Sequence, residues 1–201
     1  MEAEQDTIPD TDPLALFDEW FADAQREEPC EANAMVLATA SPEGAPSARM
    51  VLLKAHGPEG FVFYTNSLSR KGREIAANPE AALLFYWKSL QRQVRIEGPL
   101  SEVSAEMADA YFRSRPRMAQ LGSAASDQSQ LLDSRATYVA RVEELDRRCQ
   151  GEEIPRPPHW TGFQLAPRTF EFWIARPNRL HERRRFTCEG AGGWSSTLLY
   201  P

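Results

Sequence analysis

Three short basic clusters carry the residue types best able to bind an anion in this sequence. They lie at residues 70–73, 113–117 and 179–185. The first follows Ser69, a good helix-capping residue, so free backbone N–H groups, the helix dipole and two side-chain cations would meet at one point. This combination favours a phosphate-binding site, and the alternative is an ordinary amphipathic helix with solvated charges.

A further pair of cations brackets the apolar run at residues 49–54, which reads RMVLLK. The run is typical of a strand, and side chains five apart in a strand point to opposite faces unless a bulge intervenes. Arg49 and Lys54 would then serve two different anions. The alternative is a pair of solvated charges at the two ends of a strand.

In the third basic cluster, Arg179, His181 and Arg183 alternate along a segment that we expect to be a strand. They would share one face of it. Three positively biased groups in a row repel one another unless an anion or carboxylates lie among them. A solvated edge strand is the alternative interpretation of the same pattern.

The elements that must position these residues are mostly short strands. Apolar, β-branched and aromatic runs bounded by turn signals predict strands at residues 34–40, 49–54, 61–65, 81–87, 91–103, 162–166, 169–175, 179–186 and 194–199. Asp12-Pro13 should begin a helix whose apolar stripe is Leu14, Phe17, Phe21 and Ala24. Other helices are expected at residues 70–77, 104–114 and 129–149, the last with a stripe of Leu132, Val139, Val142 and Leu145. Residues 118–128 form either a short helix or a loop.

Many short strands with inserted helices favour a mainly β, antiparallel barrel over a βαβ sheet. The continuous apolar run at residues 81–87 predicts a strand buried on both faces. Gly98-Pro99 predicts a break or bulge in the strand at residues 91–103. Residues 1–11 should be a flexible tail and residues 12–201 a single domain.

Composition excludes several classes of function. Lys and Arg number 23 against 29 Asp and Glu, a net charge of −6, so general nucleic-acid binding is not expected. No apolar run approaches the length of about 20 residues that spans a membrane, and the acidic N-terminus is unlike a signal peptide. The three cysteines are far apart, as in a reduced, cytoplasmic protein.

The usual catalytic signatures are also missing. The sequence has no P-loop and no G-x-S-x-G, and its three histidines lack the spacing of metal ligands, so no metal site is expected. Separate cationic clusters beside aromatic residues instead suit a flat, phosphorylated, aromatic ligand, or two of them.

Seven motifs occur together in a recognisable order. They are RMVLLK at 49–54, FYTNxxSRK at 63–71, RQVR at 92–95, YFxSRPR at 111–117, QS at 128–129, EFW at 171–173 and RLHxR at 179–183. In this order and spacing they closely resemble the pyridoxamine 5′-phosphate oxidase family, FMN enzymes that make pyridoxal 5′-phosphate. The resemblance covers about residues 12 to 201.

The resemblance implies an FMN-binding split β-barrel, antiparallel and of Greek-key type, that forms a homodimer with two FMN sites built from both subunits. The residues that would hold FMN are Arg49, Met50, Val51, Leu52, Leu53, Lys54, Tyr64, Thr65, Arg70, Lys71, Gln93, Gln128, Ser129, Trp173 and Arg183. The substrate phosphate would be held by Lys54, Tyr111 and Arg115. Arg179 and His181 would lie over the pyridine ring of the substrate as its catalytic and binding residues.

The implied reaction transfers a hydride from C4′ of pyridoxamine or pyridoxine 5′-phosphate to flavin N5, after which O2 is reduced to hydrogen peroxide. The cofactor carries the redox chemistry, and the protein supplies orientation and electrostatics. In this scheme Arg179 orients the ring and steadies developing charge, while His181 is a binding residue more than an obligate base.

Four positions depart from the family pattern, and they predict a weaker or more open substrate site. Ala119 stands where a Ser is common, Ala124 where a Trp is usual, Asp127 where a Lys is usual, and Leu198 where an Arg is found. Two alternatives stay open. One is a related flavin oxidase acting on another aromatic substrate, as in phenazine pathways, against which the trio of Lys54, Tyr111 and Arg115 argues. The other is a flavin- or pyridoxal-phosphate-binding protein with little turnover.

Overall fold

A computed structural model describes residues 7–190 and 193–201. The helices are α1 (Pro13–Glu27), α2 (Arg70–Ala77), α3 (Ala105–Ser114), α4 (Arg117–Ala124) and α5 (Arg135–Cys149), with a 3₁₀ turn, η1, at Pro177–Arg179. The strands are β1 (Ala34–Ala40), β2 (Pro46–Leu52), β3 (Ala55–Gly57), β4 (Gly60–Asn66), β5 (Glu80–Trp87), β6 (Arg92–Glu102), β7 (Trp160–Leu165), β8 (Thr169–Ile174), β9 (Glu182–Cys188) and β10 (Trp194–Leu199).

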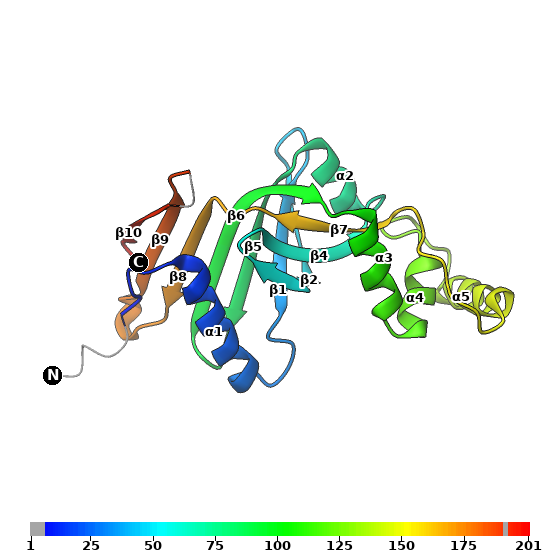
Figure 1. Ribbon diagram of the computed structural model, residues 1–201, viewed down its shortest axis with the longest axis horizontal. Coiled ribbons are helices and arrows are strands. Elements are labelled where there is room, and N and C mark those ends of the chain that lie inside the picture. Colours follow the sequence, from blue (N-terminus) through cyan, green and yellow to red (C-terminus); the bar gives the residue numbers. More distant parts are fainter. Residues whose placement is uncertain (1–6, 191–192) are drawn as a thin grey trace.

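The strands form one curled, antiparallel sheet in the order β10-β9-β8-β6-β5-β1-β2, and β7, β4 and β3 continue it from the far end of β6. β6 belongs to both parts of the sheet, because it pairs with β8 up to Glu97 and with β7 from Leu100 onwards. Figure 1 shows this long strand bending across the middle of the molecule. The predicted antiparallel barrel architecture is confirmed.

The predicted break at Gly98-Pro99 is wrong, because both residues stay paired with β5. A glycine is needed there for another reason. A Cβ atom at Gly98 would lie 2.0 Å from the carbonyl oxygen of Ala166, so only glycine allows the two chains to approach this closely. The residue pair therefore bends β6 and redirects it from β8 to β7 without interrupting the strand.

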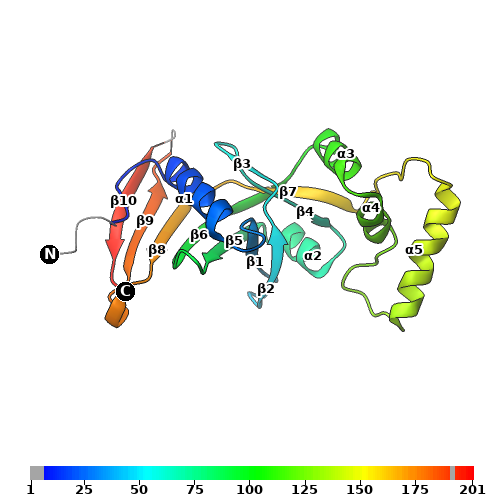
Figure 2. The same ribbon diagram turned by 90° about the horizontal axis from the view of Figure 1, so that it is seen from below.

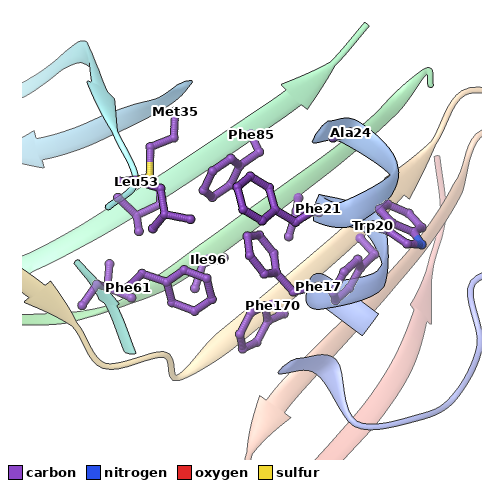
Figure 3. Packing of buried hydrophobic residues seen from close by; sticks show 14 of the residues in the cluster. Phe17, Trp20, Phe21, Ala24, Met35, Leu53, Phe61, Phe85, Ile96 and Phe170 are labelled. Carbon is purple, nitrogen blue, oxygen red and sulfur yellow. The ribbon is translucent and has the colours of Figure 1, made fainter. Parts of the chain in front are cut away.

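Helix α1 covers the concave side of the sheet and supplies much of the core. Asp12 caps it as predicted, since its Oδ1 accepts a hydrogen bond from the Ala15 N–H at 2.9 Å. Phe17 is fully buried, with its ring centroid 4.9 Å from that of Phe61 and 5.3 Å from that of Phe85. Figure 3 shows these rings gathered between the helix and the strands. Of the predicted stripe, Phe17, Phe21 and Ala24 are buried against the sheet, whereas Leu14 is only partly buried. Leu16 and Trp20, which the predicted stripe left out, are buried as well.

The predicted flexible tail lies in part outside the described residues, which begin at residue 7. Ile8 departs from the prediction, because its side chain is only 1% exposed. Its N–H donates to Glu182 Oε1 at 2.6 Å, and its carbonyl accepts from Arg184 Nε at 2.9 Å. These two bonds fasten the chain to β9 just before α1 begins.

Three other expectations need correction. β5 is buried on one face only, since Phe85 is 0% exposed and Tyr86 is 57% exposed, and no element within residues 7–190 and 193–201 covers its second face. Helix α5 begins at Arg135 and not at residue 129, because Ser134 caps it, and Leu132 therefore lies outside it. β9 begins only at Glu182, after a turn.

A short strand, β3, forms between the predicted strands at residues 49–54 and 61–65 and pairs with β4, where no strand was predicted. The open question at residues 118–128 is settled in favour of a short helix, α4, followed by a loop. Among the residues described, none of the helices is long and apolar enough to cross a membrane.

Candidate active site

A cavity of about 330 Å³ opens where the ends of β2 and β4 meet helices α3 and α4. Figures 1 and 2 both place this region at the opposite end of the molecule from β8, β9 and β10. The residues that line the cavity are Met50, Val51, Leu52, Lys54, Tyr64, Thr65, Asn66, Lys71, Tyr111, Arg115, Ser123, Ser126, Gln128 and Trp160. Ten of these fourteen residues belong to the set that the sequence singled out for FMN or substrate.

Lys71 points into the cavity from the first turn of α2. Its side chain is 9% exposed, and its Nζ donates to Thr65 Oγ1 at 3.0 Å and to Gln128 Oε1 at 2.8 Å. Burial, reinforced by the nearby Arg49 and opposed by Glu74, lowers the pKa of Lys71 to about 8. The contacts of this ammonium group are neutral oxygens, which leave its charge available to a ligand.

Arg115 follows the last turn of α3 and is held without a carboxylate. Its guanidinium lies 4.9 Å from the centre of the Trp160 ring, and its Nη1 donates to Ser123 Oγ at 2.8 Å. Burial lowers the pKa of Arg115. Lys54 also lines the cavity, and its Nζ lies 5.9 Å from the centre of the Tyr111 ring. Within the described part of the chain, no ion pair joins Lys54, Lys71 or Arg115 to an acidic residue, so the cavity carries uncompensated positive charge suited to an anion.

One wall of the cavity is a stack of aromatic rings. The Tyr64 ring lies 4.1 Å from that of Tyr111 and 5.3 Å from that of Trp160, with interplanar angles of 20° and 9°. Burial, with a smaller contribution from Tyr111, raises the pKa of Tyr64, so its hydroxyl stays protonated at neutral pH. The wall offers flat apolar surface beside the cations, as a phosphorylated aromatic ligand requires.

Arg49 and Arg70 do not line the cavity, and both bind the same buried carboxylate. Arg70 Nε lies 2.8 Å from Glu74 Oε1, and Arg49 Nη2 lies 3.2 Å from Glu74 Oε2. Arg49 and Lys54 therefore face different surroundings, as strand alternation predicts. Leu53 is part of the core, as Figure 3 shows, and Ser129 adjoins the cavity-lining Gln128 with a left-handed φ of 74°.

The remaining predicted residues form a second group, the β8–β9 cluster, consisting of Gln93, Trp173, Arg179, His181 and Arg183. Trp173 pairs with Gln93 across β6 and with Arg183 across β9. The His181 ring centroid lies 4.7 Å from that of Trp173. None of the five lines the cavity, and β8 and β9, which carry Trp173 and Arg183, lie at the other end of the protomer (Figures 1 and 2).

The prediction that Arg179, His181 and Arg183 share one strand face is wrong. Asn178 and Arg179 have φ values of 56° and 62°, so the chain makes a left-handed turn before β9 starts. Such a conformation is strained for residues other than glycine and is common where a loop serves a ligand. Arg183 itself is paired, with its Nε 2.8 Å from Glu171 Oε1.

The hydrogen bond at His181 fixes one of its ring nitrogens. The backbone N–H of Arg176 donates to His181 Nδ1 at 3.1 Å, so Nδ1 acts as an acceptor. A neutral imidazole held in this way carries its proton on Nε2. The ring is thus set up to donate a hydrogen bond and not to accept one.

Two of the four departures from the family pattern have simple structural outcomes. Asp127 does not line the cavity and pairs with Arg141 of α5, Oδ2 to Nη1 at 2.6 Å. Leu198 lies exposed on β10. Ala119 and Ala124 lie on α4, where Ala119 lacks a hydroxyl and Ala124 packs beside a small core cluster.

Sequence reasoning missed four residues that line the cavity. They are Asn66, Ser123, Ser126 and Trp160. Asn66 belongs to the motif at residues 63–71, and Ser123 and Ser126 each precede a position that departs from the family pattern, Ala124 and Asp127. These three residues could therefore have been predicted from the sequence. Trp160 follows the proline-rich segment IPRPPH at residues 154–159 and carried no signal, because only the fold brings it against Tyr64 and Tyr111.

Family models match most of the chain. The model described as pyridoxamine 5′-phosphate oxidase matches residues 21–149, and the one described as the pyridoxine 5′-phosphate oxidase C-terminal dimerisation region matches residues 160–201. Proteins named pyridoxine/pyridoxamine 5′-phosphate oxidase are similar over nearly their whole length. That of Erythrobacter litoralis is 59% identical, covering 96% of this chain and 93% of its own. That of Novosphingobium aromaticivorans is 58% identical, covering 98% and 97%.

Two solved structures are also similar to this chain. PhzG from Burkholderia lata, crystallised with tetrahydrophenazine-1-carboxylic acid, is 34% identical and superposes with a TM-score of 0.89, covering 96% of this chain and 94% of its own. A pyridoxamine 5′-phosphate oxidase-related, FMN-binding protein from Nostoc punctiforme, 18% identical with a TM-score of 0.73 and covering 92% and 97%, shares the split-barrel fold. With its fold, its cationic cavity and matches along almost its entire length, the chain belongs to the pyridoxamine 5′-phosphate oxidase family of oxidoreductases.

Proposed function

We propose that this protein uses FMN to oxidise pyridoxamine or pyridoxine 5′-phosphate to pyridoxal 5′-phosphate. The observation that carries the proposal is the cavity with three cations, Lys54, Lys71 and Arg115, that have no acidic partner among the residues described. Both the cofactor and the substrate carry a phosphate and a flat ring. A cavity with several free cations and an aromatic wall fits such ligands.

Within the cavity, Lys54, Tyr111 and Arg115 hold the substrate phosphate in our assignment. Lys71, which donates to Thr65 and Gln128, would bind the cofactor phosphate. When bound, FMN would supply the electron acceptor for the hydride leaving C4′, and O2 would reoxidise it with release of hydrogen peroxide. Pyridoxine 5′-phosphate would give the aldehyde directly, whereas the imine formed from pyridoxamine 5′-phosphate would be hydrolysed by water to the aldehyde and ammonia. The chain's own residues would bind the two ligands and orient them for the reaction.

The β8–β9 cluster completes this site from the partner subunit in our proposal, which makes the active enzyme a homodimer. Three observations support it. The cluster lies far along the sheet from the cavity of its own protomer (Figure 2). Large apolar side chains are exposed, among them Met50 at 61% and Tyr86 at 57%. Finally, residues 160–201 match a dimerisation region.

In such a dimer, Arg179 places a permanent positive charge beside the substrate ring, where it orients the ring and stabilises developing negative charge. His181 donates a hydrogen bond from Nε2, since its Nδ1 already accepts from Arg176. A donor at this position binds a ring substituent and does not remove a proton.

The deciding experiment uses the purified dimer with added FMN. We expect a yellow protein that releases hydrogen peroxide and forms pyridoxal 5′-phosphate from pyridoxamine 5′-phosphate in air. Unphosphorylated pyridoxamine should be a much poorer substrate, because it cannot engage Lys54 and Arg115. A yellow protein that forms no aldehyde would contradict the proposal in favour of a binding role.

The likeness to PhzG makes a related oxidase acting on a phenazine precursor the second candidate. A substrate of that kind carries a carboxylate and no phosphate ester, so it would leave part of the cationic trio unused. Faster peroxide release with a tetrahydrophenazine carboxylic acid than with pyridoxamine 5′-phosphate would favour this second function.

A further inference from the structure

Arg115 is tied to two successive turns of α4, at its backbone and at its side chain. Gln120, which is 9% exposed, donates from Nε2 to the carbonyl oxygens of Arg113 at 3.2 Å and Arg115 at 2.7 Å. The Arg115 side chain donates from Nη1 to Ser123 Oγ at 2.8 Å. The helix thus holds both ends of a long, flexible residue whose charge faces the cavity.

The Ser123 hydroxyl is itself held in one orientation. It donates to the carbonyl oxygen of Ala119, one helical turn earlier, at 2.9 Å, which leaves its lone pairs for Arg115. On the other side, the Trp160 ring lies 4.9 Å from the guanidinium. A fixed hydroxyl and a fixed ring face together restrict where this guanidinium can lie.

The choice of a hydroxyl in place of a carboxylate matters for anion binding. A carboxylate at position 123 would neutralise Arg115 and compete with an incoming phosphate for its N–H groups. A serine accepts one hydrogen bond and leaves the positive charge intact. It also keeps the remaining N–H groups of the guanidinium free to form a pair of parallel bonds to phosphate oxygens.

We infer that Ser123 is a positioning residue, which fixes the Arg115 guanidinium for the phosphate monoester of the substrate. This inference rests on the proposed function of the cavity and extends it to a residue outside the family motifs. Pre-positioning reduces the loss of side-chain freedom on binding, so it acts on substrate affinity and not on the redox step.

The test compares three variants of the FMN-loaded dimer. Ser123→Ala removes the bond to Arg115, Ser123→Thr retains a hydroxyl, and Ser114→Ala is the matched control. Ser114 also bonds a backbone carbonyl of its own helix, that of Tyr111 at 2.8 Å, but it is exposed and does not line the cavity.

We expect Ser123→Ala to raise KM for pyridoxamine 5′-phosphate about tenfold and to leave kcat within about twofold. Ser123→Thr should restore most of the affinity, and Ser114→Ala should match the wild type. Titration calorimetry with pyridoxal 5′-phosphate, which needs no turnover, should show the same loss of affinity in Ser123→Ala. KM for unphosphorylated pyridoxamine should not change.

Equal affinity of the wild type and Ser123→Ala for pyridoxal 5′-phosphate would overturn the inference. So would an equal rise of KM for phosphorylated and unphosphorylated substrates, since that would indicate a general disturbance of α4. Failure of the wild type to form any aldehyde would instead contradict the proposed function, and calorimetry would still decide whether Ser123 assists phosphate binding.

Discussion

The buried carboxylate of Glu74 offers a sharp test of how α2 is held on the β1–β2 hairpin. It is 6% exposed and accepts hydrogen bonds from Thr39 and Ser47, in addition to those from Arg49 and Arg70. Burial alone would raise its pKa, but the bonds from Thr39, Arg70, Arg49 and Ser47 outweigh burial and hold the pKa of Glu74 at about 2.

The pKa gives the size of the expected effect. The difference between the ordinary value of 4.5 and about 2 corresponds to about 3.4 kcal/mol of preference for the charged form in the folded state. Because the Arg70 side chain is 60% exposed, solvent screens part of this interaction, and we reduce the expectation to about 2 kcal/mol. Glu74→Gln, which keeps the shape and removes the charge, should destabilise the dimer by this amount at pH 7.

The sign of the pH dependence follows from the lowered pKa. The folded state binds the Glu74 proton less readily than the unfolded state, so the stabilisation is complete above about pH 4.5 and is lost as the pH falls towards 2. The stability gap between wild type and Glu74→Gln should therefore be constant from pH 7 to 5 and clearly smaller at pH 3.5.

Urea unfolding at one fixed protein concentration with saturating FMN measures this gap, since the proposed dimerisation and FMN binding would both add to stability. The control is Glu80→Gln, whose carboxylate pairs with Arg168 at 2.9 Å on the surface and should contribute less than about 0.5 kcal/mol. A Glu74→Gln dimer as stable as the wild type at pH 7 would refute the reasoning. A gap of the same size at pH 7 and pH 3.5 would show that charge is not its cause.

Three further predictions concern the cofactor site, the dimer and the core. FMN affinity, measured by flavin fluorescence, should fall above about pH 8 as free Lys71 loses its proton. Lys71→Arg should abolish this fall, and an unchanged fall in that variant would assign it to another group. Lys71→Met and Trp173→Ala should each be inactive, but their subunits mixed should regain about a quarter of wild-type activity, since half the dimers would hold one intact site. No recovery would contradict a site shared between subunits. Phe17→Ala should cost about 3–5 kcal/mol in urea unfolding, because it empties the centre of the aromatic core, and a cost below about 1 kcal/mol would show that the core closes around the gap.

Local chemistry in the sequence determined the elements and the family. The apolar stripe of α1 and its Asp12 cap are short-range features, so they could be predicted without the fold. The same holds for Ser69, which caps α2 through the Gly72 N–H at 3.3 Å. The ordered motifs then sufficed to predict ten of the fourteen residues that line the cavity.

Only the tertiary structure decided which of those residues meet. Sequence placed Arg70 and Lys71 together, yet the fold turns Lys71 into the cavity and binds Arg70 to Glu74. It also brings Trp160 against Tyr64, 96 positions earlier, and bends the chain at Arg179 before β9 can begin. These outcomes depend on long-range strand pairing and on competition between partners for each charge. Neither the strand pairing nor the partner of each charge can be predicted from neighbouring residues in the sequence, because both are determined only when distant strands and helices pack together.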